Sequence, residues 1–427
     1  MSELAFPKGF LWGTATAAHQ IEGGNSNSDW WEWELKPGGP CREPSGSAIG
    51  GYDRFEADST LLAGLGFGVY RFSVEWARVE PAEGEVDPAA LEHYRGVVES
   101  VRSAGMTPMV TLNHFTLPLW VAKKGGWLSA EVPALFARYC RRVVETFGES
   151  VDWYCTINEP GIVAFGGYMG ALGFPPGTRG LPKWRRANEN LILGHFRARD
   201  VVKTLRPSSM VGLTNSMQEW ESNAGGRPAM QFARRMMEDV FLDAAQDDDF
   251  VGVQTYSRAV LELPRLVGLL ARPALAIGPL ASLVVGGITN RQTGGGEPTR
   301  DTRPGIRRTD MGYEYRPQAV AATVARVAEY LPRKPIVVTE NGIATANDAE
   351  RIEFTTHALR ALHELIGRGV PLRGYIHWSA FDNFEWALGY GMQFGLIGVD
   401  RASMERTPKP SAKWLGEVSK RNSLTIR

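Results

Sequence analysis

Short β-rich runs alternate with longer helix-like stretches from one end of this 427-residue chain to the other. Between two parallel strands, the chain must return from the carboxyl end of the first to the amino end of the second. A helix is the usual connection. Eight such repeats favour an α/β fold closed into a single (β/α)8 TIM barrel, with a doubly wound sheet as the alternative. The predicted strands span residues 10–14, 69–72, 107–112, 153–157, 210–213, 250–254, 336–339 and 372–377.

The stretches between these runs have helical patterns, and no change of composition marks a linker between domains. Because α/β barrels routinely exceed the usual domain length, we expect one domain over residues 1–427. An apolar insertion at about residues 257–300 follows the sixth strand and is expected at the rim of the barrel. The predicted helices include residues 88–104, 130–147, 187–205, 231–245, 317–330 and 348–368.

The balance of charge excludes some classes of protein. The chain has 47 Lys and Arg residues against 47 Asp and Glu residues, which argues against a nucleic-acid partner. Its three cysteines, Cys41, Cys140 and Cys155, are too few and too widely spaced for a disulfide framework or a zinc site. The first residues lack a basic segment followed by a long apolar one, so a cytoplasmic location is the simplest prediction. We expect no metal, no cofactor and no integral membrane segment.

Polar side chains gather near the carboxyl ends of the predicted strands. Such residues often only cap helices, but in a closed barrel these ends meet at one rim, where active sites lie. Acids and amides suit sugar hydroxyls, and aromatic rings suit the apolar faces of sugars. The residues that we expect at this rim are His19, Gln20, Arg71, Asn113, His114, Asn158, Glu159, Asn215, Gln254, Tyr256, Glu340, Asn341, His377 and Trp378.

Two of these residues are glutamates that each follow an apolar, β-rich run. Glu159 comes at the end of Trp-Tyr-Cys-Thr-Ile-Asn-Glu over residues 153–159, and Glu340 ends Ile-Val-Val-Thr-Glu over residues 336–340. Glycoside hydrolysis needs two carboxyl groups that face one cleft. The pair therefore predicts a glycosidase.

Short motifs along nearly the whole chain indicate a family. They are Phe-Leu-Trp-Gly at residues 10–13, Thr-Ile-Asn-Glu-Pro at 156–160, Thr-Glu-Asn-Gly at 339–342, Trp-Ser at 378–379, Asp-Asn-Phe-Glu-Trp at 382–386 and Phe-Gly-Leu at 394–396. In this order they resemble glycoside hydrolase family 1, the β-glucosidase family. A single match of five residues is not specific, but several in the same order are.

The resemblance implies a retaining mechanism with the two carboxyl groups about 5–5.5 Å apart. Glu340 is then the nucleophile and Glu159 the acid and base. Arg71 and Tyr256 are expected to hold Glu340 as an anion, with a structural ion pair at the rim as the less favoured alternative for Arg71.

The resemblance also implies a set of sugar contacts. Asn158 is expected to reach the 2-hydroxyl, and Trp378 to stack under the ring. The plainer alternatives are a core tryptophan at Trp378 and a structural histidine at His114. The predicted substrate-binding residues are Gln20, His114, Asn158, Trp378, Glu385, Trp386 and Phe394.

The chain departs from the family pattern in the sugar pocket. Gln254-Thr255-Tyr256 stands where the family usually has Asn-Tyr-Tyr, so the tyrosine is kept and the amide is one methylene longer. Glu385 is kept, and members that take 6-phosphorylated sugars replace it. A dianionic phosphate beside this acid would be repelled, which argues against phosphorylated substrates.

The segment at residues 261–288 is long and apolar. Arg272, Pro273 and Pro279 interrupt it, which disfavours a transmembrane helix. Two short helices packed on the barrel, an apolar wall or lid for the aglycone, a peripheral membrane contact and an oligomer interface are the interpretations that stay open.

The leading interpretation is a retaining β-glycosidase, in particular a β-glucosidase that hydrolyses terminal non-reducing β-D-glucosyl residues, with galactosyl or fucosyl residues as further substrates. Its expected partner is a small β-glycoside, and an oligomer stays open. A transglycosylase would share the same glycosyl-enzyme. A non-catalytic sugar-binding relative is disfavoured, because such relatives tend to lose a catalytic acid and this chain keeps both.

Overall fold

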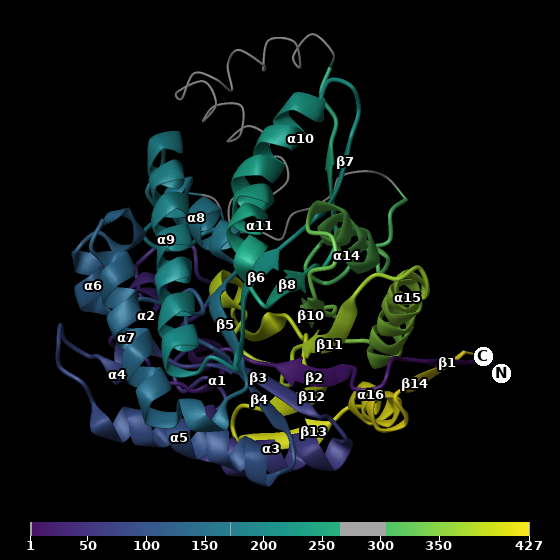
Figure 1. Ribbon diagram of the computed structural model, residues 1–427, viewed down its shortest axis with the longest axis horizontal. Coiled ribbons are helices and arrows are strands. Elements are labelled where there is room, and N and C mark those ends of the chain that lie inside the picture. Colours follow the sequence, from purple (N-terminus) through teal and green to yellow (C-terminus); the bar gives the residue numbers. More distant parts are fainter. Residues whose placement is uncertain (1, 171, 265–304, 427) are drawn as a thin grey trace.

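Eight parallel strands form a closed barrel in the computed structural model, which describes residues 2–170, 172–264 and 305–426 (Figure 1). The strands follow one another around the barrel in chain order, and the last pairs with the first. The predicted barrel is therefore confirmed, and the doubly wound alternative is wrong. The barrel strands are β2 Leu11–Ala15, β3 Val69–Ser73, β4 Thr107–Thr111, β5 Trp153–Asn158, β6 Met210–Ser216, β8 Phe250–Gln254, β10 Ile336–Asn341 and β11 Leu372–Trp378.

Helices surround the barrel and connect its strands (Figure 1). Each predicted helical stretch contains helix, but residues 231–245 are divided by a π-helical segment, η3 Arg235–Asp239. The main α-helices are α3 Gly51–Leu65, α5 Pro88–Ser103, α7 Val132–Phe147, α8 Pro160–Tyr168, α9 Leu181–Leu205, α10 Arg227–Arg234, α11 Val240–Ala244, α14 Ala319–Tyr330, α15 Asp348–Gly367 and α16 Pro410–Arg421. The shorter ones are α1 Ala18–Ile21, α2 Asp29–Glu34, α4 Trp76–Val79, α6 Leu119–Lys123, η1 Gly126–Leu128, η2 Gly148–Ser150, η4 Ala245–Asp247 and η6 Trp386–Gly391.

Close packing fills the inside of the barrel below its carboxyl rim. A Cβ atom at Gly252 would lie 2.6 Å from the Thr214 side chain, so only glycine lets β8 approach β6 this closely. The interior is thus a packed core and not a pore, and any ligand must bind at the rim. A buried apolar cluster drawn largely from these strands comprises Ala15, Val69, Met109, Cys155, Phe250, Val337 and Ile376, with further members near the rim.

Three small sheets among the described residues lie outside the barrel. β1 Ser2–Ala5 pairs antiparallel with β14 Ser423–Ile426, which brings the two ends of the chain side by side (Figure 1). β12 Ile397–Asp400 pairs with β13 Glu405–Pro408, and β7 Glu219–Ser222 pairs in parallel with β9 Arg258–Leu261. β9 belongs to the predicted insertion at residues 257–300.

Most of the apolar segment at residues 261–288 lies outside the described residues. Its interpretation as short helices, an aglycone wall, a membrane contact or an oligomer interface therefore stays a prediction. No helix among the described residues is both long enough and apolar enough to cross a membrane.

Candidate active site

Glu340 is held in place by two donors at the carboxyl end of β10. Arg71 Nη1 donates to Glu340 Oε1 at 2.5 Å, and the Tyr256 hydroxyl donates to Oε2 at 2.7 Å. Glu340 is 3% exposed, so little water competes for its charge. Both contacts expected from the sequence are present, and both favour the ionised form of this carboxyl group.

Arg71 lies in the middle of β3 and not at its end, where we had placed it. Its side chain is fully buried, and such a charge is stable only when its donors are paired. Nε donates to Thr111 Oγ1 at 3.1 Å, and Nη2 donates to Asn158 Oδ1 at 2.5 Å. One guanidinium therefore orients both Glu340 and a neighbouring amide.

Glu159 directly follows β5 and precedes α8, whose first residue is Pro160. Its backbone is in the left-handed region at φ 43° and ψ 57°, a conformation that costs energy for a residue with a side chain. The backbone N–H of Glu159 donates to Thr214 O at 2.8 Å, which holds the turn. Its carboxyl group receives a hydrogen bond from Ser216 on β6.

The two glutamates have different pKa values because their surroundings differ. Burial raises the pKa of Glu159 well above its usual value, and the negative charge of Glu340 raises it further. Burial also raises the pKa of Glu340, but the charge of Arg71 and the hydrogen bond from Tyr256 lower it again. A single proton shared by this pair therefore sits on Glu159, while Glu340 is ionised.

A second group of buried polar side chains surrounds Asn158, the last residue of β5. Gln254 Nε2 donates to Asn158 Oδ1 at 2.9 Å, and Thr214 Oγ1 lies 3.3 Å from the same oxygen. Asn158 Nδ2 lies 3.1 Å from His114 Nε2. Burial lowers the pKa of His114 well below its usual value, and Arg71 lowers it further, so its imidazole is neutral.

Gln20 and Glu385 meet beside these groups. Gln20 Nε2 donates to the Phe384 carbonyl at 2.8 Å and lies 3.5 Å from Glu385 Oε2. Burial raises the pKa of Glu385 to about 8, and the charge of Glu340 contributes to the shift. Gln20 Oε1 and His114 Nδ1 have no hydrogen-bond partner among the described residues. They are polar atoms available to a bound ligand.

Aromatic rings form the apolar part of this region. Trp386 stacks on His19 with ring centroids 5.4 Å apart, and Trp378 stacks on His114 with centroids 5.9 Å apart. Phe394 packs edge-on against Tyr256 at 5.7 Å. The predicted substrate-binding rings thus lie beside the predicted polar contacts, on elements far apart in the chain.

Two residues of this region were not predicted as site residues. Ser216, which contacts Glu159, is adjacent to Asn215, and a longer prediction for the fifth barrel strand would have included it. Tyr313 is the second: burial raises its pKa, and the charges of Glu385 and Glu159 add to the shift. No strand leads into Tyr313, so only the tertiary fold reveals its position.

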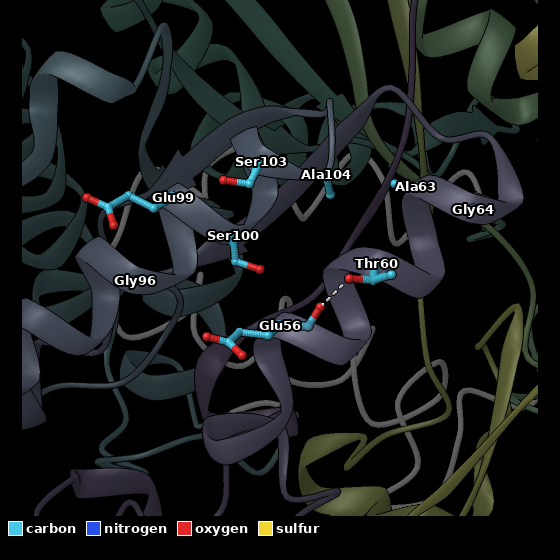
Figure 2. A pocket seen from close by; sticks show the side chains of 9 residues that line it. All are labelled: Glu56, Thr60, Ala63, Gly64, Gly96, Glu99, Ser100, Ser103 and Ala104. Carbon is cyan, nitrogen blue, oxygen red and sulfur yellow. Dashed lines mark hydrogen bonds between the residues drawn. The ribbon is translucent and has the colours of Figure 1, made fainter.

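A hollow of about 800 Å³ lies away from this region, between α3 and α5 on the outside of the barrel. Figure 2 shows side chains that line it. Side chains such as Ala63, Ser100 and Ser103 line it, and none of the predicted site residues does. Within the described ranges, no three His, Cys, Asp or Glu side chains are grouped so that they could hold a metal ion.

Paired buried carboxyl groups at the carboxyl rim of a (β/α)8 barrel, one ionised and one protonated, are the arrangement that glycosidases use. Comparison with known proteins agrees with this class. The model of glycosyl hydrolase family 1 matches residues 2–264 and 285–424, so the chain belongs to this family. The resemblance seen in the motifs is confirmed, and the protein is a retaining β-glycosidase.

Individual relatives are similar over nearly their full lengths. The chain is 33% identical to thermostable β-glucosidase B of Thermobispora bispora, covering 99% of this chain and 92% of that protein. It is 30% identical to a bifunctional β-D-glucosidase/β-D-fucosidase of Bifidobacterium breve, covering 96% and 97%. The crystal structure of β-glycosidase BGL167 is 39% identical with a TM-score of 0.82, and the match covers 99% of each chain.

The pKa shifts predict a bell-shaped dependence of kcat/KM on pH. If Glu159 is the acid and Glu340 the nucleophile, as expected from the sequence, activity falls at high pH as Glu159 loses its proton and at low pH as Glu340 gains one. Because the hydrogen bond from Tyr256 lowers the pKa of Glu340, Tyr256→Phe moves the acid limb to higher pH, by about one unit. Glu159→Gln is the control, since it removes the alkaline limb. An acid limb of Tyr256→Phe that stays in place or moves to lower pH contradicts this assignment.

Proposed function

We propose that the protein is a β-glucosidase in which Glu340 is the nucleophile and Glu159 the acid and base. The observation that supports this best is the asymmetry of the two acids. Glu340 faces a guanidinium and a phenol, whereas Glu159 is buried beside a negative charge. Glu159 therefore carries the proton that the leaving group takes up, and Glu340 carries the negative charge that attacks C1.

In the first step, an oxygen of Glu340 bonds to C1 of the sugar while the bond from C1 to the aglycone oxygen breaks. The proton of Glu159 passes to that oxygen, and the aglycone leaves as a neutral alcohol. In the second step, Glu159 takes a proton from water as the water oxygen bonds to C1. The bond to Glu340 breaks, so both side chains return to their starting states and the β-configuration is retained.

The sugar contacts belong to the same proposal. Asn158 Nδ2 is the donor for the 2-hydroxyl, a contact that strengthens as positive charge develops on the ring. Gln20 and Glu385 hold hydroxyls farther from C1, while Trp378 lies against a face of the ring. His114, Trp386 and Phe394 complete the pocket. We propose that the two catalytic carboxyl groups lie about 5–5.5 Å apart, the spacing of a retaining enzyme.

A panel of aryl glycosides tests the sugar preference. We expect turnover of the β-D-glucoside, slower turnover of the β-D-galactoside or β-D-fucoside, and none of the α-D-glucoside. The names of the relatives support glucose and fucose as alternatives. Preference for an α-glycoside, or for a β-mannoside over all of these, would refute the proposal.

We also propose one catalytic unit over residues 1–427 in a reducing, cytoplasmic compartment. Pairing of β1 with β14 ties both ends of the chain to one another and supports a single unit. All three cysteines, Cys41, Cys140 and Cys155, are free thiols, which supports a reducing compartment. Cell fractionation followed by an activity assay tests the location.

A further inference from the structure

A continuous chain of hydrogen bonds runs from Arg71 through Asn158 to His114, and Gln254 joins it from the side. Arg71 Nη2 and Gln254 Nε2 both donate to Asn158 Oδ1, at 2.5 and 2.9 Å. Asn158 Nδ2 lies 3.1 Å from His114 Nε2. Arg71, Asn158 and Gln254 are fully buried and His114 is 5% exposed. These groups therefore bond to one another and not to water.

The chemistry of the groups sets each direction. A guanidinium only donates, so the Asn158 atom that faces it must be the oxygen. The other amide atom is then the nitrogen, which donates to His114. Nε2 of His114 must accept, and the proton of the neutral ring therefore sits on Nδ1. Nδ1 is buried and has no hydrogen-bond partner in the described part of the chain.

Gln254 donates the second hydrogen bond that Asn158 Oδ1 accepts. A carbonyl oxygen has two lone pairs, and Arg71 occupies one of them. Thr214 Oγ1 lies 3.3 Å from this oxygen and equally 3.3 Å from the Ile157 carbonyl, so its proton has another acceptor. Gln254 is the last residue of β8, and its register partners are Ser216 on β6 and Glu340 on β10. It is therefore at the level of both catalytic acids.

We propose that Gln254 is a positioning residue of this glycosidase. It occupies the second lone pair of Asn158 Oδ1 and so adds to Arg71 in holding the amide with its N–H toward His114 and the pocket. Asn158 then donates to the sugar 2-hydroxyl and His114 donates to a neighbouring hydroxyl. The effect on turnover rests on the proposed function, whereas the tautomer of His114 does not.

The kinetic test uses Gln254→Met, which keeps the length of the side chain and removes its donor. The ratio of kcat/KM for an aryl β-glucoside to that for its 2-deoxy analogue is expected to fall about tenfold, because the variant loosens a contact that only the 2-hydroxyl makes. Turnover of the 2-deoxy substrate stays within about threefold. Glu329→Ala, at an exposed position on α14, is the control, and its ratio stays at the wild-type value. Equal losses on both substrates in Gln254→Met, or the same fall in Glu329→Ala, would overturn the proposal.

The tautomer is measured independently of turnover. Long-range proton–nitrogen NMR of the wild-type protein distinguishes the two nitrogens of each imidazole, and a His114→Gln spectrum assigns the signals of His114. We expect the bonded proton on Nδ1 in the wild type and also in Gln254→Met, because Arg71 alone fixes which atom of the Asn158 amide faces His114. A wild-type proton on Nε2 would overturn the proposal even if the enzyme hydrolyses glucosides. Absence of any glucoside turnover, with the proton on Nδ1, would instead contradict the proposed substrate alone.

Discussion

Replacing Glu340 with alanine lowers kcat/KM on an aryl β-glucoside by about 10⁴-fold, equivalent to about 5.4 kcal/mol of transition-state stabilisation. The variant has no group that can bond to C1, and Arg71 and Tyr256 then face an empty space. Steady-state kinetics on the purified variant measures the loss. Glu329→Ala is the control, because Glu329 is exposed on α14, and its activity stays at the wild-type level.

Adding a small anion to Glu340→Ala tests whether Glu340 is the nucleophile. In Glu340→Ala, azide can enter the space left by the carboxylate and attack C1 from the face that Glu340 attacks in the wild type. The product is then the α-glycosyl azide, since a single displacement inverts the β-configuration. Release of the β-glycosyl azide, or activity that is unchanged by the substitution, would show that Glu340 is not the nucleophile.

Glu159→Ala makes turnover depend strongly on the leaving group. An alkyl β-glucoside needs a proton on its leaving oxygen, so its kcat/KM is expected to fall by about 10³-fold. A dinitrophenyl β-glucoside leaves without a proton, and its first step stays fast. The glycosyl-enzyme then accumulates, because no base activates water in the second step, and rapid mixing shows a burst of dinitrophenol.

Azide again provides the matched test of this role. With Glu159 removed, the anion attacks the glycosyl-enzyme from the side opposite to Glu340 and yields the β-glycosyl azide. It also restores the steady-state rate on the dinitrophenyl substrate. Equal losses on alkyl and dinitrophenyl glucosides, without a burst, would contradict the assignment of Glu159 as acid and base.

The barrel could be predicted from the sequence because each strand is an apolar run between helical patterns. The ends of the strands were less predictable. We expected the fifth barrel strand to end at residue 213, whereas β6 continues to Ser216, and Thr214, Asn215 and Ser216 stay in register with β8. A polar residue usually marks a strand end, but these three are buried at the rim.

The contacts of the site were only partly predictable. The two glutamates stand out, since each belongs to a local motif. The position of Arg71 inside β3 was missed, because a charge in the middle of a buried strand is stable only with partners from β4, β5 and β10. Tyr313 and the hydrogen bond from Gln254 to Asn158 join segments far apart in the chain, and no spacing in the sequence indicates them.

The most direct test of the mechanism is to trap the glycosyl-enzyme. A 2-deoxy-2-fluoro β-glucoside with a good leaving group slows both steps, but the second becomes the slower one, so the intermediate persists. Digestion and mass spectrometry then locate the added sugar. We expect one fluoroglucosyl group per chain, attached to Glu340. Attachment to another residue, or inhibition without any covalent label while the natural product emerges as the α-anomer, would contradict the account.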